Sequence, residues 1–342
     1  MTAAPTAASA SAAHDAIVAA LAQSTKHRRY SGPVVRWLMT NDQTRDKGRA
    51  IANCALMLKL EAAQGLDEPP EAGVIAARVC NARLCPYCEW RRARVQRARL
   101  LTGAAALLEA EPRLVPLMLT LTLRNVPMEG LRPTFDQLHK AWNNLTKRES
   151  FPTRLWYRRT EVTVSTPEGR AKKRRDGRGS ESAREGKETG EVTLHPHLHC
   201  LLFVSPAYFG RRYIKQDVWA ENWRQCLGID YTPVVDVRRA YGKDGEKTSA
   251  SLPLSATMEA SKYITKAADL PSLGPLVADF DEAVRGVRMR AVSRDLGRYV
   301  SAGDVKASEL LDKPIEAQPD GPAALQVIAR WCDRRGAYFP YL

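Results

Sequence analysis

The chain has 342 residues, of which 44% are hydrophobic, so it can bury a full core in one large domain with appendages or in two domains. Its 52 Lys and Arg residues against 38 Asp and Glu residues leave a net charge of +14, which favours a polyanionic partner such as nucleic acid. No apolar run reaches the roughly 18 residues of a membrane-spanning helix, and the N-terminus lacks a signal-peptide pattern. We therefore expect a cytoplasmic protein with no membrane partner that handles DNA or RNA.

The N-terminal third divides into two predicted parts. Residues 1–30 are rich in alanine, and we expect a disordered tail with at most a marginal helix near Asp15–Gln23. Residues 31–110 are expected to form a zinc-knuckle segment followed by a basic helix over residues 90–109.

The cysteines of this segment have the spacing of a metal site. Cys80, Cys85 and Cys88 stand close together, and Cys54 is the best choice for a fourth ligand. This predicts a structural Zn²⁺ held by four thiolates. A redox pair formed by the last two cysteines is the alternative, but it leaves Cys80 without a role.

The helix after the cysteines is basic in its first turns. Arg91, Arg92 and Arg94 are the residues expected to contact DNA if this helix lies along a phosphate backbone. An ordinary solvated face explains the same charges equally well.

The central part, residues 111–270, alternates between strand and helix patterns. Strands are predicted at 115–126, 155–165, 191–204 and 233–239, and helices at 131–148, 215–227 and 254–268. The charged, apolar-poor residues 166–190 are predicted to be a disordered insertion between two hairpin strands. The order indicates an α+β fold with a ferredoxin-like antiparallel sheet and helices on one face. Residues 271–342 are predicted to form a helical C-terminal region.

Three histidines lie at alternate positions of the strand predicted at 191–204. His195, His197 and His199 therefore share one face, while Leu198 and Cys200, at the alternate positions, point into a core. Neutral imidazole is a common ligand of divalent metals, which favours a metal site over histidines that merely form hydrogen bonds. In a hairpin with the strand at 155–165, Glu161 can face these histidines and leave Mg²⁺ or Mn²⁺ open positions for substrate oxygens.

The helix predicted at 254–268 carries three polar residues on one face. Glu259 and Tyr263 are four positions apart, and Lys266 follows three positions later. A tyrosine nucleophile needs activation, and a carboxylate one turn away can take a proton from water or from the phenol. Lys266 can stabilise the phenolate or a pentacovalent phosphate. On composition alone, however, such a tyrosine is usually a partly buried amphipathic residue.

Five motifs in this order resemble a known family. They are the cysteine knuckle, Leu119-Thr120-Leu121-Thr122, Thr160-Glu161-Val162-Thr163, His195-Pro-His-Leu-His199, and Glu259-x3-Tyr263-x2-Lys266. Together they resemble the single-tyrosine HUH endonucleases that act as rolling-circle replication initiator (Rep) proteins of plasmids. The resemblance runs from about residue 50 to residue 270.

The resemblance implies a nicking domain over residues 111–270 and a specific chemistry. Tyr263 would attack a phosphate at the double-strand origin, forming a 5′-phosphotyrosine and freeing a 3′-OH that primes replication. His197 and His199 would hold the catalytic metal, with Glu161 as first choice and His195 as second choice for the third ligand. Glu259 would activate water when the circle closes. The expected partners are single-stranded or hairpin origin DNA and the host helicase, polymerase and single-strand-binding protein.

Other functions use fewer of these residues. A relaxase or transposase with the same core usually places its tyrosine before the histidines or uses two tyrosines. A non-enzymatic zinc-dependent DNA-binding regulator, or a metallohydrolase with another substrate, leaves Tyr263 without a role.

Overall fold

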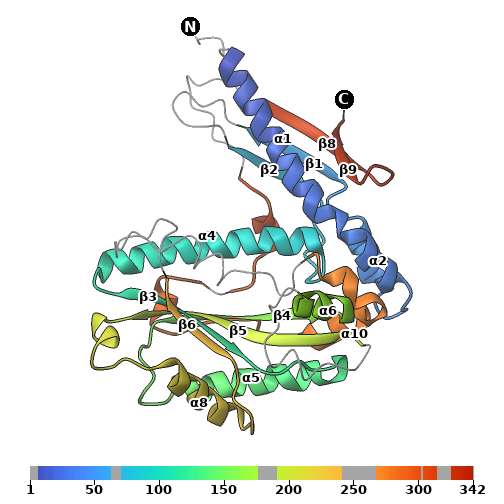
Figure 1. Ribbon diagram of the computed structural model, residues 1–342. Coiled ribbons are helices and arrows are strands. Elements are labelled where there is room, and N and C mark those ends of the chain that lie inside the picture. The colour runs from blue at the N-terminus through green and yellow to red at the C-terminus, as the bar shows by residue number, and fades with distance from the viewer. Residues whose placement is uncertain are drawn as a thin grey trace. The chain divides into compact units, whose positions relative to one another are not determined.

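The structure, a computed structural model, describes residues 7–62, 71–175, 191–240, 267–301, 303–313 and 325–341. The described chain is mixed α+β, with two antiparallel sheets and several helices (Figure 1). It divides into two compact units. Unit 1 comprises Met1–Arg92 and Val305–Leu342, and unit 2 comprises Ala93–Asp304.

Unit 1 combines segments from both ends of the chain in one sheet with the strand order β2-β1-β8-β9. Its strands are β1 (Met57–Ala62), β2 (Ala72–Ala77), β8 (Leu325–Cys332) and β9 (Ala337–Pro340). Its helices are α1 (Ala7–Arg29), α2 (Ser31–Met39), α3 (Arg45–Ala52), the first turns of α4 (Pro86–Ala110), and the 3-10 turn η5 (Ala307–Leu310).

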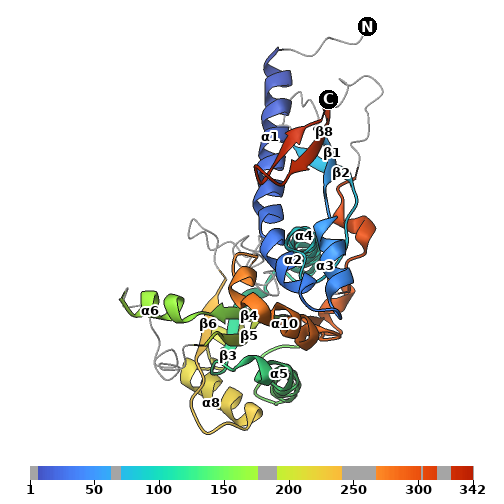
Figure 2. The ribbon, with the colours of Figure 1, turned by 90° about the vertical axis from the view of Figure 1, so that its right-hand side faces the viewer.

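Helix α1 lies along one face of this sheet (Figure 2). The side chains of Leu58, Leu60 and Ala329 on that face are fully buried, as is Ala13 of the helix. Two predictions were therefore wrong. Residues 7–29 form a helix instead of a disordered tail, because alanine has the highest helix propensity and this helix has a sheet face to cover. The C-terminal region is not wholly helical, since β8 and β9 pair with β1 and with each other.

Unit 2 is built on a sheet with the strand order β6-β3-β5-β4-β7. Its strands are β3 (Val115–Thr122), β4 (Trp156–Ser165), β5 (Thr193–Val204), β6 (Val235–Arg239) and β7 (Arg290–Val292). Its helices are the rest of α4, α5 (Leu131–Thr146), α6 (Pro167–Arg175), α8 (Gln216–Leu227) and α10 (Val277–Val284), with 3-10 turns η1 (Met128–Gly130), η2 (Pro206–Phe209), η3 (Leu270–Leu276) and η4 (Leu296–Arg298).

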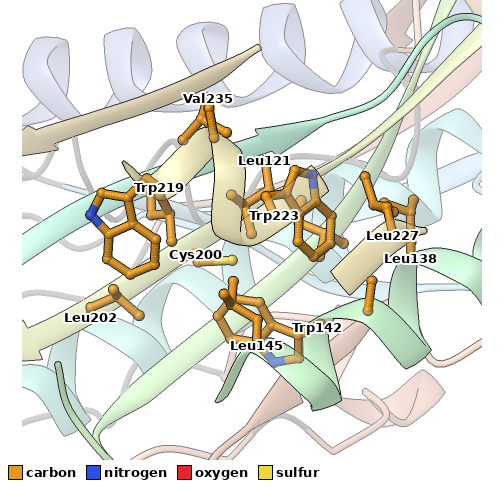
Figure 3. Close-up of a cluster of buried hydrophobic side chains, with 14 of the residues drawn as sticks. Leu121, Leu138, Trp142, Leu145, Cys200, Leu202, Trp219, Trp223, Leu227 and Val235 are labelled. Atoms are coloured by element: carbon orange, nitrogen blue, oxygen red, sulfur yellow. The ribbon is translucent and has the colours of Figure 1, made fainter. Parts of the chain in front are cut away.

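The main core of unit 2 lies between this sheet and helices α5 and α8 (Figure 3). Three tryptophans, Trp142, Trp219 and Trp223, are almost fully buried there against the strands. Leu198 and Cys200 of β5 point into this core, as their alternation with the histidines predicts. The predicted strands and the helices at 131–148 and 215–227 are thus confirmed, with ends shifted by a few residues.

The opposite face of the sheet is partly covered as well. Leu100, Ala104 and Leu107 of α4 pack against Leu201 and Phe203 of β5. The prediction of helices on one face was therefore wrong. The α4 helix carries small and apolar residues in this stretch, but its arginine-rich start suggested a solvated element instead.

Three expectations concern the remaining segments. The first part of the predicted insertion forms helix α6, and residues 176–190 lie outside the described residues. The predicted helix at 254–268 lies outside them up to residue 266. Among the described residues, no helix has the length and apolar character needed to cross a membrane.

Candidate functional site

Strands β4 and β5 bring three predicted ligands together in unit 2. The antiparallel register places Glu161 directly opposite His197. His199 lies opposite Arg159, which is two positions before Glu161 and on the same face of β4. Paired residues of an antiparallel ladder point to the same face, so the carboxylate and both imidazoles converge. Glu161, His197 and His199 are all buried, with exposed fractions of 3%, 7% and 5%.

The distances within this cluster suit one divalent ion. Nε2 of His199 lies 3.1 Å from Nε2 of His197 and 3.1 Å from Oε2 of Glu161, and Nε2 of His197 lies 3.7 Å from the same oxygen. Neighbouring ligands of an octahedral ion with bonds of about 2.1 Å are about 3.0 Å apart. The three atoms therefore have about the spacing of neighbouring ligands of one such ion.

The hydrogen bonds behind the imidazoles favour the form that binds metal. Nδ1 of His197 lies 3.0 Å from the carbonyl oxygen of His195, which can only accept, so this nitrogen carries the proton. Nε2 of the neutral ring then presents a lone pair toward the cluster. On the other ring, Nδ1 of His199 lies 3.3 Å from the hydroxyl oxygen of Thr120.

Electrostatics also indicate a cation at this point. Burial by itself raises the pKa of Glu161, but the adjacent imidazoles of His197 and His199 bring that pKa well below its ordinary value, so the carboxylate stays charged. A buried carboxylate and two nitrogen lone pairs within 4.8 Å of one another need a positive charge among them. A divalent metal meets this need with the donor set that is present.

His195 lies apart from the three converging ligands. It pairs with Thr163, and its Nδ1 lies 2.9 Å from Oδ1 of Asn125. Asn125 also donates to the hydroxyl of Thr193 at 3.0 Å. The sequence did not point to Asn125, because a single asparagine after a strand has no distinctive pattern. Thr120 belonged to a recognised motif, but nothing in the sequence assigned it a partner.

A second polar group lies on the other face of β4, next to Glu161. The hydroxyl of Thr160 accepts a hydrogen bond from Nη1 of Arg158 at 3.0 Å and lies 2.9 Å from Nε2 of His139 on α5. The pKa of His139 is lowered from 6.5 to about 3, mainly by burial and to a smaller extent by the charge of Arg158. This histidine is therefore neutral and can accept from the Thr160 hydroxyl.

The four predicted zinc ligands meet in unit 1. Sγ of Cys88 lies 3.4 Å from Sγ of Cys54 and 3.7 Å from Sγ of Cys80, and all four sulfur atoms, including that of Cys85, lie within 4.8 Å of one another. A tetrahedron with Zn–S bonds of about 2.3 Å has edges of about 3.8 Å, whereas a disulfide is about 2.05 Å long. The spacing fits a shared ion and leaves all four cysteines free of disulfides.

The backbone around these cysteines turns tightly toward the sulfur atoms. The residues that follow Cys54 and Cys80, Ala55 and Asn81, both have a φ of 53°, a conformation that is uncommon for residues with a side chain. The backbone N–H of Cys80 donates to Sγ of Cys54 at 3.4 Å. Such bonds stabilise a thiolate. Hydrogen bonds from the other three thiols, that of Cys54 above all, lower the pKa of Cys80.

Two of the arginines predicted to bind DNA are buried in unit 1. Arg91 pairs with Asp312 at 2.8 Å and donates to the carbonyl of Leu310 at 2.5 Å. Arg92 pairs with Glu89 and donates to both oxygens of Asn81 at 2.9 and 2.6 Å. These contacts brace the cysteine segment and argue against a contact with DNA. Arg94 is exposed.

The structure does not describe the residues predicted for the chemical step. Glu259, Tyr263 and Lys266 lie outside the described residues, so their roles stay predictions.

Comparison with known proteins places the chain in a family. A family model described as "Replication protein" matches residues 72–339, a range that includes Cys80, both cluster histidines and Tyr263. "Protein rep" of Bacillus amyloliquefaciens is 26% identical over 311 residues, covering 83% of this chain and 82% of the relative. "Protein rep" of Lactiplantibacillus plantarum is 30% identical over 275 residues, covering 76% and 79%.

A third relative, "Protein rep" of a Bacillus species, is 27% identical over 291 residues, covering 78% of this chain and 84% of the relative. No solved structure matches the chain. Because the family model and these relatives each span most of the chain, the resemblance to plasmid replication initiators is confirmed, and the chain belongs to the replication protein family.

Proposed function

We propose that this chain nicks one strand of plasmid DNA at the replication origin, with an HUH-type metal site and a tyrosine nucleophile. The observation that carries the proposal is the buried cluster of Glu161, His197 and His199. The sheet of unit 2 supports it. Apart from helix α6 in the insertion, the order β3-α5-β4-β5-α8-β6 and the strand arrangement β6-β3-β5-β4 match the pattern expected of a ferredoxin-like sheet. DNA nicking fits the net charge of +14 as well.

The metal proposed for this cluster is Mg²⁺ or Mn²⁺, which when bound would supply a Lewis acid for the scissile phosphate. Glu161, His197 and His199 would hold it, and His195 would act from outside the ligand set. The hydrogen bond from Nδ1 of His197 to the His195 carbonyl keeps the ring in the tautomer that could bind a metal. Two imidazoles in the donor set favour Mn²⁺ over Mg²⁺, which prefers oxygen ligands.

The proposed nucleophile is Tyr263, on the strength of its place in the family motif. Its phenolic oxygen forms a bond to phosphorus as the bond from phosphorus to the 3′ oxygen breaks, giving a 5′-phosphotyrosine and a free 3′-OH. The phenol's proton passes to a base, and Lys266 stabilises the negative charge that builds up. Glu259 activates the water that later releases the chain from the strand.

The cysteine cluster is proposed to hold a structural Zn²⁺ that ties the segment around Cys54 to the start of α4. The proposed DNA partner is a single-stranded or hairpin origin. The freed 3′-OH then needs the helicase, polymerase and single-strand-binding protein of the host for extension.

The test is a covalent adduct between the protein and a labelled single-stranded origin oligonucleotide in Mn²⁺ or Mg²⁺. Tyr263→Phe should abolish the adduct, whereas Tyr213→Phe, which alters a tyrosine that is 56% exposed in unit 2, should leave it intact. An adduct that persists in the Tyr263→Phe variant would show that another residue is the nucleophile. A regulator that merely binds DNA would form no adduct in either protein.

A further inference from the structure

The sheet of unit 1 has a second face, opposite to helix α1, that is open to solvent. The β1–β8 register places Met57 beside Arg330 and Lys59 beside Ile328 on this face. Strand β9 continues both rows, because Phe339 pairs with Arg330 and the backbone N–H of Tyr341 donates to the carbonyl of Ile328 at 2.8 Å. We call this surface the open face, and it consists of Met57, Lys59, Ile328, Arg330, Phe339 and Tyr341.

Large apolar side chains gather on the open face. Met57, Ile328, Phe339 and Tyr341 are 46%, 43%, 36% and 54% exposed. They make up four of the ten large hydrophobic side chains that are exposed in the described part of the chain. Scattered exposed residues of this kind are ordinary, but a cluster on one sheet face indicates a surface that contacts a partner.

The open face is also cationic. Each cross-strand row carries one cation and one aromatic ring, Arg330 with Phe339 and Lys59 with Tyr341, and the rows are about 7 Å apart along the strands. Neither Lys59 nor Arg330 forms an ion pair with any described residue. The acidic residue of the same face, Glu61, is 4% exposed and accepts a hydrogen bond from Gln326.

This combination specifies the chemistry of the partner. Exposed rings on a sheet stack against unpaired bases, and cations between the rings neutralise the phosphates that link those bases. A duplex keeps its bases stacked inside and offers nothing to the rings. A second copy of the chain would bring the same cations against one another. The side chain of Arg335 lies over the ring of Phe339 at 5.1 Å and extends the cationic row.

We propose that the open face of unit 1 binds single-stranded DNA, as a site separate from the metal cluster of unit 2. The proposal rests on the proposed function to the extent that nicking and strand displacement generate the single strand. It assigns unit 1 the task of holding unpaired DNA without regard to sequence, through stacking on Phe339 and Tyr341 and through the charges of Lys59 and Arg330.

The test is fluorescence anisotropy of a labelled oligo-dT with the full-length Tyr263→Phe protein and no added Mg²⁺ or Mn²⁺, so that binding is read without nicking. Replacing both Phe339 and Tyr341 by Ala should raise the Kd about tenfold or more, since each stacked base contributes strongly to affinity. Replacing Lys59 and Arg330 by Ala should reduce the slope of log Kd against log salt concentration by about 1.4, the value for two phosphate contacts on a single strand.

The matched control is Phe209→Ala in unit 2. Phe209 has the same exposure of 36%, and the guanidinium of Arg239 lies over its ring at 4.3 Å. This variant should bind oligo-dT as the parent does. Unchanged affinity in the Phe339 and Tyr341 variant, or an equal loss in the Phe209 variant, would overturn the proposal. A third result would also overturn it: light scattering shows that the parent protein is a dimer, and the Phe339 and Tyr341 variant is a monomer that still binds oligo-dT with the parent's affinity. The open face would then join two copies of the chain.

Steady-state nicking separates this proposal from the proposed function. With Tyr263 present and metal added, replacing Phe339 and Tyr341 by Ala should raise KM for the origin oligonucleotide and leave kcat unchanged. Glu161→Gln should lower kcat and leave oligo-dT binding unchanged. An adduct that persists in the Tyr263→Phe variant would refute the assignment of Tyr263 as the nucleophile, and it would leave the oligo-dT binding result unaffected.

Discussion

The neutral histidine His139, which contacts Thr160 of strand β4, makes unit 2 sensitive to acid. His139 has a pKa of about 3 in the folded protein, against 6.5 when unfolded, because burial and the charge of Arg158 disfavour its protonated form. The unfolded chain therefore binds this proton first as the pH falls, so the stability that neutral His139 provides is complete above pH 6.5 and is lost progressively between about pH 6.5 and pH 3. At pH 5 the loss is about 2 kcal/mol relative to neutral pH.

The substitution His139→Gln isolates this contribution. Glutamine can still form a hydrogen bond with Thr160 but does not titrate in this range. Urea unfolding followed by tryptophan fluorescence, at pH 7 and at pH 5, gives the loss of unfolding free energy in each protein. The loss should be about 2 kcal/mol smaller in the variant than in the wild type. His14→Gln, which removes an exposed histidine from α1, controls for the loss of a histidine as such. Equal losses in wild type and His139→Gln would refute the reasoning.

Three further predictions follow from the metal sites and the packing. Metal analysis should find about one zinc per chain, lost in Cys85→Ser, and zinc-free wild-type protein would contradict the four-thiolate site. Glu161→Gln should raise the Mn²⁺ concentration needed for half-maximal adduct formation. The increase should exceed the roughly 10–100-fold loss seen when a residue that only hydrogen-bonds to a metal ligand is removed. An unchanged Mn²⁺ requirement would exclude Glu161 as a ligand. Gly103→Ala should lower the unfolding free energy by about 1–3 kcal/mol, because the new Cβ would overlap the carbonyl oxygen of Tyr299. Gly32→Ala, where a Cβ meets nothing within 4 Å, should be neutral or slightly stabilising in the same denaturation experiment.

The central sheet and the cluster of Glu161, His197 and His199 could be predicted from the sequence because their information is local. Alternation of apolar and polar residues marks β3, β4 and β5, and three alternate histidines fix which face of β5 carries the ligands. The partner of those histidines needed one further step. Placing Glu161 opposite His197 required the β4–β5 register, and the hairpin pattern suggested it despite the long insertion between the strands.

The errors arose where the outcome depends on distant parts of the chain. Strand β8 pairs with β1, more than 260 residues earlier, and its exposed Ile328 interrupts the alternation that marks a strand with one buried face. Helix α1 is weakly amphipathic by sequence, and it is the sheet face beneath it that gives its apolar residues a place to pack. Arg91 looks like a phosphate-binding residue in the sequence, because its ion-pair partner Asp312 lies far along the chain.

The most direct test of the proposed nicking chemistry is the identity of the residue that carries the DNA. Adduct formed with a single-stranded origin oligonucleotide in Mn²⁺ can be digested with nuclease and protease and mapped by tandem mass spectrometry. We expect a nucleotide phosphate on Tyr263, and we expect no such adduct when His197 and His199 are replaced by Ala. A phosphate on another residue, or an adduct that forms without the histidines, would contradict the proposed chemistry.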